Sequence, residues 1–182
     1  MVAGDYEKTY LNETLPRLKD YLLQDELYWP VSVAGNPPYP QMTLGNILFF
    51  QARLSANGKA AAANTQATIT NTYKEWHSHW IEKGQREFSA RMRQWSRFME
   101  ELKGDFKAHS AYYDNEVRTR AILQLLKSTL GKANLPEDAS LLDVLDATLW
   151  PHLLEGPFMW DKQLAAGFPK EDFWFLYGFL QN

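Results

Sequence analysis

The sequence predicts an all-α protein: an irregular bundle of five to six helices around one long central helix, with a proline-rich loop across one end. Three observations predict this class. Apolar residues recur at helical spacing through most of the chain, prolines and glycines gather between these segments, and no run reads as a convincing strand. With 182 residues, the chain is expected to be a single helical domain, 1–182, large enough to fold without disulfides or metals.

The first helix is expected from about Asp5 to Tyr28, with a kink or an early break at Pro16, because proline removes a backbone donor and clashes with the preceding turn. Residues 30–40, PVSVAGNPPYP, contain four prolines and a glycine and are expected to form a loop. Thr43 is a good N-cap for a second helix, which the Asn-Gly pair at 57–58 should end.

The central segment runs from about Lys59 to Phe106 without a proline. From Ile69 onward, its apolar positions follow one another at steps of three or four residues, which is the helical period. One continuous helix of this length would measure roughly 60–70 Å. We therefore expect Gly84 and Gly104 to be the places where it bends or stops.

Three shorter helices are expected after the central segment. One covers residues 112–130 and stops at Gly131, the next begins at a capping box opened by Ser140 and ends at Pro151, and the last begins after Pro169. The only strand candidate is Val31–Ala34, which is too short to alter the fold class.

Composition excludes several classes of protein. The chain has no cysteine, so disulfides, thiolate zinc sites, iron–sulfur clusters and cysteine nucleophiles are ruled out. The opening MVAGDYEKTY does not resemble a signal peptide, and no apolar run approaches the roughly 18 residues of a membrane span. We expect a soluble, cytoplasmic protein with no membrane partner.

The stretch WHSHW, residues 76–80, raises the question of a metal site. Each helical residue turns the side chain by about 100°, so His77 and His79 lie about 200° apart and cannot share one ion. His77 falls on the apolar stripe, either as a buried, hydrogen-bonded histidine or as a ligand or general base in a pocket. His79 falls on the outer face, where we expect it to form an exposed i, i+4 pair with Glu75. A metal site would require His77 to meet His109 and His152 from other helices.

Residues 22–50 resemble the first helix, Trp/Pro loop and second-helix start of the DinB-like metal-binding four-helix bundles. The resemblance implies a histidine ligand shortly after the opening of the second helix. Here the opening Thr43-Leu44-Gly45 is followed by Phe49, Phe50 and Gln51, and the family's later pair of histidines at i, i+4 is absent too. The ligands that the resemblance implies are missing, so we expect neither a metal nor another cofactor.

Charge is distributed unevenly along the chain. Residues 83–132 carry eleven bases and six acids, net +5, whereas residues 133–182 carry two and eight, net −6. Arg86, Arg93 and Arg97 form one ridge opposite the apolar stripe of the central helix, a candidate nucleic-acid surface. Glu82, four residues before Arg86, and Glu101, four residues after Arg97, neutralise part of this positive charge. No aromatic residue lies on the ridge to stack on bases. The sequence therefore disfavours a nucleic-acid partner.

Motifs that carry chemistry are missing. The sequence has no G-x-S-x-G, no glycine-rich phosphate loop and no carboxylate pair that stands out from a solvated helix face. We assign no catalytic residue and expect a non-enzymatic protein, with an enzyme that lacks a known motif as the open alternative.

Aromatic residues are in excess, with seven tryptophans, nine tyrosines and ten phenylalanines. A terminal helix carrying FWFLYGFL, residues 173–180, would be apolar nearly all round and would have to be covered. The first hypothesis is therefore association, as a homo-oligomer or as a subunit of a larger assembly. The contact is expected to involve Phe173, Trp174, Tyr177 and Phe179.

The second hypothesis is a helical bundle that holds a small ligand in an aromatic pocket. The residues expected near such a site are Trp29, Trp76, His77 and Trp80.

Overall fold

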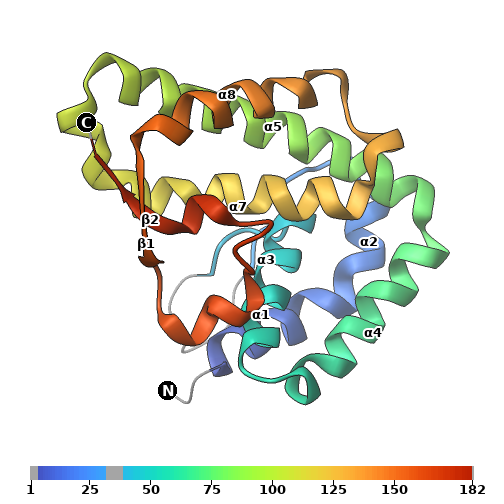
Figure 1. Cartoon of the computed structure of the whole chain (residues 1–182). Helices are drawn as coiled ribbons and strands as arrows, with labels where there is room; N and C mark the ends of the chain where they lie inside the picture. Colours follow the sequence, from blue (N-terminus) through green and yellow to red (C-terminus); the bar gives the residue numbers. More distant parts are fainter. Residues whose placement is uncertain (1–3, 32–38, 182) are drawn as a thin grey trace.

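The computed structural model describes residues 4–31 and 39–181 (Figure 1). It confirms the all-α class: long helices dominate, and a small two-stranded sheet closes one side. Among the described residues, none of the helices combines the length and the apolar character that a bilayer span requires. Most of the proline-rich loop, together with most of the strand candidate Val31–Ala34, lies outside the described residues.

The first helical segment breaks at Pro16, as predicted. α1 covers Asp5–Thr14, a 3-10 turn (η1) covers Leu15–Arg17, and α2 covers Leu18–Leu23. The segment ends five residues earlier than the predicted Tyr28. The buried Lys83 donates hydrogen bonds to the carbonyl oxygens of Gln24 and Glu26 and so holds the turn that follows α2.

Thr43 caps α3 (Leu44–Ala56), as predicted: its hydroxyl oxygen accepts a hydrogen bond from the backbone N–H of Asn46 at 3.0 Å. Gly58, with φ of 126°, separates α3 from the next helix, a conformation that glycine adopts without a steric penalty. Backbone hydrogen bonds between Trp29 and Met42, at 3.1 and 2.7 Å, join the segment that follows α2 to the residues just before α3.

The central segment is two helices: α4 (Lys59–Glu75) and α5 (His77–Gly104). They meet at Trp76, whose φ of −115° and ψ of 36° interrupt the helix. α4 packs on α3 whereas α5 packs along α7, so one straight helix could not serve both contacts. The prediction of a long central helix is confirmed for α5, which spans about 42 Å at 1.5 Å per residue. Gly104 ends it, whereas Gly84 lies inside it.

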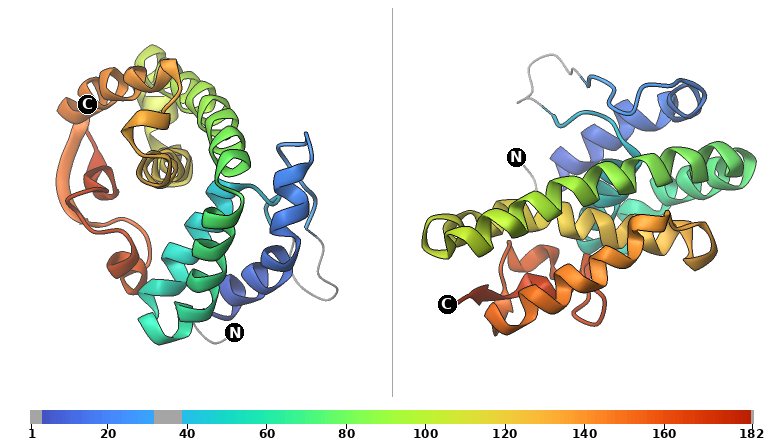
Figure 2. Two further views of the ribbon diagram at one scale, coloured as in Figure 1. Left: turned by 90° about the vertical axis from the view of Figure 1, so that its right-hand side faces the viewer. Right: turned by 90° about the horizontal axis from the view of Figure 1, so that it is seen from above.

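α6 (Phe106–His109) and a 3-10 turn, η2 (Ser110–Tyr112), reverse the chain into α7 (Tyr113–Leu130). α7 ends at Gly131, with φ of 71°, as predicted. Figure 2 shows α7 end on, enclosed by α5, α8 and the C-terminal segment. The 3-10 turns η3 (Lys132–Asn134) and η4 (Glu137–Ser140) lead into α8 (Leu141–Leu149), which a short turn, η5 (Trp150–His152), closes at Pro151.

A buried ion pair holds α8 on α7. Arg120, 2% exposed, donates two hydrogen bonds to the carboxylate of Asp146, at 2.8 and 2.7 Å. The guanidinium also lies 4.3 Å from the ring centre of Phe175, so the same side chain anchors the C-terminal segment.

The predicted last helix is wrong. Residues Leu153–Phe158 form β1 and Tyr177–Leu180 form β2, which pair antiparallel, and the intervening chain contains only 3-10 turns, η6 (Lys162–Gly167) and η7 (Trp174–Leu176). The register shifts between Glu155 and Phe158, where Gly156 and Pro157 interrupt the ladder. Aromatic and branched residues suit strands as well as buried helices, and the partner strand is remote in sequence.

Candidate functional site

A buried polar network joins the start of α3 to α5. Glu87 is fully buried, and its carboxylate accepts a hydrogen bond from the backbone N–H of Gly45 at 2.8 Å. Arg91, one turn later, donates to the same carboxylate at 3.3 Å. A side chain at position 45 has no room, because an ideal Cβ would lie 2.6 Å from a carboxylate oxygen of Glu87 and 2.3 Å from Ile122. Glycine therefore lets α3 approach the carboxylate.

Two further arginines surround this network. Arg53 on α3 pairs with Glu7 on α1 at 2.7 Å. Arg118 on α7 donates a hydrogen bond to the side-chain oxygen of Asn46 at 3.1 Å, and among the described residues it has no carboxylate partner. Three arginines thus face two glutamates, and Arg118 is the cation left without an anion.

Arg118 is held by aromatic rings instead of a carboxylate. Its guanidinium lies 4.8 Å from the ring centre of Phe49 and 5.8 Å from that of Phe50. Burial, followed by the neighbouring positive charges of Arg91 and Arg53, lowers the pKa of Arg118 from its ordinary value. The side chain is therefore a half-buried cation whose remaining N–H groups can still donate.

Arg118 lines a cleft of about 350 Å³, which we call the arginine cleft. It is lined by Phe49, Arg53, Asp114, Asn115, Arg118, Trp160, Asp161 and Leu164. α3 and α7 supply one side, and the segment around η6, which packs beside α3 in Figure 1, supplies the other.

Trp160 forms the aromatic wall opposite α7. Its indole N–H donates to the backbone oxygen of Asp114 at 2.9 Å, and its ring meets that of Phe49 edge to face, with centres 5.7 Å apart. Gly167 brings η6 against α3, because an ideal Cβ there would lie 2.2 Å from the backbone oxygen of Ala52. These contacts fix the width of the cleft.

The arrangement suits binding better than bond breaking. A guanidinium with free donors recognises a carboxylate or phosphate, and aromatic walls accept an apolar or planar body. Among the described residues, no group of three or more histidine, aspartate or glutamate side chains is placed to hold a metal ion.

The predicted interface residues pack mostly within the molecule. Phe173 is buried, and its ring meets that of Phe168 at 5.2 Å. Trp174 and Tyr177 are half-buried, and the hydroxyl of Tyr177 donates to the backbone oxygen of Phe168 at 2.8 Å. Only Phe179, 53% exposed, presents most of its ring to solvent.

The predicted aromatic pocket residues do not line the arginine cleft. Trp80 is fully buried, and Trp29 packs edge to face on Tyr21. His77, expected on the apolar stripe, is exposed, and its ring meets that of Tyr73 edge to face with centres 4.8 Å apart. The expectation of a buried His77 is wrong: its side chain is exposed, whereas Trp80, in the same first turn of α5, is fully buried. Trp76 lies at the junction itself.

Trp76 also explains why the pair expected between Glu75 and His79 is not formed: the helix breaks between the two residues. The ring of His79 instead meets the Trp76 ring edge to face at 5.7 Å.

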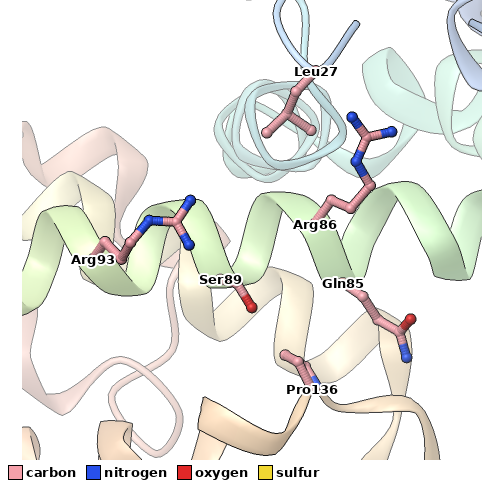
Figure 3. Close-up of a pocket in the computed structure, with 6 residues that line it drawn as sticks. All are labelled: Leu27, Gln85, Arg86, Ser89, Arg93 and Pro136. Atoms are coloured by element: carbon pink, nitrogen blue, oxygen red, sulfur yellow. The ribbon is translucent and has the colours of Figure 1, made fainter. Parts of the chain in front are cut away.

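The predicted arginine ridge is exposed and borders an open groove of about 470 Å³ on α5. The groove is lined by Leu27, Gln85, Arg86, Ser89, Arg93 and Pro136 (Figure 3). Arg86 is engaged with the backbone oxygen of Asp25 at 2.6 Å, and Arg97 with Glu101 at 3.1 Å. Within the described part of the chain, Arg93 alone of the three makes no hydrogen bond or ion pair, so the ridge offers little unpaired charge.

Sequence reasoning missed the residues of the arginine cleft. Arg118, Phe49 and Trp160 come from segments far apart in the chain, and each has an ordinary local context. The one available signal is Asp114 four residues before Arg118, which reads as a routine helical ion pair.

Comparisons with known proteins add no assignment. No family model matches the chain, and neither a curated protein nor a solved structure matches it. The function is therefore inferred from the geometry of the described residues.

Proposed function

We propose that the protein binds a small organic molecule through a carboxylate, which Arg118 receives in the arginine cleft. The observation that carries this proposal is a half-buried arginine, left without a carboxylate partner among the described residues, that faces a cleft with aromatic walls. Leaving a half-buried charge unpaired costs free energy, so a ligand anion would complete the network.

A carboxylate fits the cleft better than a phosphate does. Asp114 and Asp161 also line it, and they would repel a doubly charged phosphate more strongly than a singly charged carboxylate. Phe49 and Trp160 provide room for an apolar body beside the anion.

The test is isothermal titration calorimetry with 3-phenylpropionate as the probe. The wild-type protein should show saturable binding, and Arg118→Gln should weaken it by roughly 10- to 100-fold, the equivalent of about 1.5–3 kcal/mol for a charged hydrogen bond. Arg93→Gln is the matched control: Arg93 is exposed and lines the separate groove on α5, so this variant should bind the probe as the wild type does. Circular dichroism checks that each variant is folded. Equal binding by Arg118→Gln, or no binding by the wild type, would overturn the proposal.

We propose self-association as a second candidate function, with a second copy of the chain as the partner. Leu154 and Phe179 are cross-strand neighbours on one face of the hairpin and are 47% and 53% exposed. Among the described residues, β1 pairs only with β2, so its outer edge is unpaired and can accept the same strand of another copy.

Native mass spectrometry tests this candidate. A dimer at twice 21.1 kDa is expected, and Phe179→Glu should convert it to a monomer without unfolding it, because that ring faces solvent. A wild-type monomer at all concentrations would eliminate the candidate. Tyr177 and Phe173 are unsuitable for this test, since their truncation would disturb internal packing.

A further inference from the structure

The arginine cleft contains opposite charges that do not neutralise each other. Asp114 and Arg118 both line it and stand one helical turn apart on α7, a spacing at which acid and base often pair. They form no ion pair in the described structure. Arg118 is turned toward Asn46 and the ring of Phe49, and the Asp114 carboxylate accepts only a side-chain hydrogen bond from Asn115, at 3.2 Å.

The rest of the lining does not cancel these charges. Arg53 is occupied by Glu7, so it contributes little free positive charge. Asp161 accepts a backbone hydrogen bond from Gln163 at 3.0 Å and forms no ion pair in the part of the chain that the structure describes. Among the described residues, the cleft therefore presents a cation without an ion pair, Arg118, and two carboxylates without one: Asp114 beside it on α7, and Asp161 on the opposite wall.

From this distribution we infer that the ligand is a small zwitterion, with a carboxylate for Arg118 and an ammonium group for Asp114, carried on an apolar body. The inference rests on the proposed function and names its ligand class. A ligand with only a carboxylate would leave Asp114 without a positive partner. A ligand with only an ammonium group would be repelled by the positive charge of Arg118. Both protein charges sit within one turn, so the two ligand charges must lie close together, as they do in a free amino acid.

The aromatic walls define the apolar body. Phe49 lies beneath the guanidinium, and Trp160 stands edge to face against it, clamped by its hydrogen bond to the Asp114 backbone. A volume of about 350 Å³ is at the small end of ligand pockets. A single aromatic or branched amino acid matches this size and these walls.

Isothermal titration calorimetry with three probes of the same size tests the inference. L-phenylalanine carries both charges, 3-phenylpropionate only the carboxylate, and 2-phenylethylamine only the ammonium group. L-phenylalanine should bind at least tenfold more tightly than either of the others. Asp114→Asn, which keeps the size of the exposed side chain, should remove that advantage without weakening 3-phenylpropionate. Arg118→Gln should weaken both carboxylate probes.

The outcomes separate the inference from the proposed function. If 3-phenylpropionate binds as tightly as L-phenylalanine and depends on Arg118, the zwitterion inference is overturned and the carboxylate site stands. If L-phenylalanine is preferred but Asp114→Asn keeps the preference, the role of Asp114 is overturned. If the amine binds most tightly, or if no probe binds, both the inference and the proposed function are overturned. Thermal unfolding of each variant confirms that a loss of binding is not a loss of fold.

Discussion

Replacing Glu87 by alanine should be among the most destabilising single changes in the protein. The carboxylate is fully buried, accepts the Gly45 N–H at 2.8 Å and faces Arg91 at 3.3 Å. Glu87→Ala would leave a backbone donor unpaired at the start of α3 and a guanidinium, 13% exposed, without its anion. Both penalties arise because water cannot replace the lost carboxylate.

The magnitude follows from these two losses. Removing a hydrogen bond to a charged acceptor costs about 1.5–3 kcal/mol, and removing one partner of a buried ion pair costs about 3–5 kcal/mol. The two figures describe the same carboxylate and are not summed, so we expect a loss of about 3–5 kcal/mol in the free energy of unfolding. For a domain of this size, that lowers Tm by roughly 6–20 °C.

The assay is urea denaturation followed by circular dichroism, with Glu82→Ala as the control. Glu82 is an exposed acid on the same helix, and its loss should change the free energy of unfolding by about 0.5 kcal/mol or less. A double-mutant cycle with Arg91→Ala isolates the ion pair. If Glu87→Ala costs no more than Glu82→Ala, the reasoning that this carboxylate joins α3 to α5 is refuted.

Two further predictions concern stability. Burial raises the pKa of Tyr10, Tyr21 and Tyr113 well above the ordinary 10.0, so they stay protonated in the folded state while the unfolded chain loses those protons. Their contribution to the free energy of unfolding is complete below pH 10 and falls above it, by roughly 1.4 kcal/mol per tyrosine per pH unit. Tyrosinate absorbance should therefore show the ionisation of these three side chains only as the protein unfolds. Gly167→Ala should cost about 1–3 kcal/mol in urea denaturation, because its Cβ meets the α3 backbone, whereas Gly104→Ala, with open space around it, should not destabilise the protein.

The helices could be predicted wherever a local signal marks their ends. Thr43, Pro16 and Gly131 act through their own backbone chemistry, and each marks a boundary where the sequence places it. The break at Trp76 has no such signal. It results from the different neighbours of α4 and α5, which are tertiary contacts that a periodic stripe does not reveal.

The C-terminal hairpin and the arginine cleft were not predictable for a related reason. β2 is a strand because Leu153–Phe158 lies beside it, and a dense aromatic run has no periodicity that separates a strand from a buried helix. Arg118 differs from the exposed arginines of α5 only in what surrounds it, namely Phe49, Asn46 and two other arginines. The sequence places Arg118 on a helix, but it does not reveal which side chains from other elements surround it.

The composition of the cleft has a consequence for hydrogen exchange. Its walls combine α3 and α7, inside the bundle, with residues 160–164, which belong to a segment built of short 3-10 turns. Such turns open more readily than long helices, so their amides should exchange with solvent first. A ligand that contacts both walls would stabilise the closed form of this segment in proportion to its occupancy. Slower amide exchange in η6 upon ligand addition, with little change in α4, would then report binding through the wall of the cleft that opens most readily.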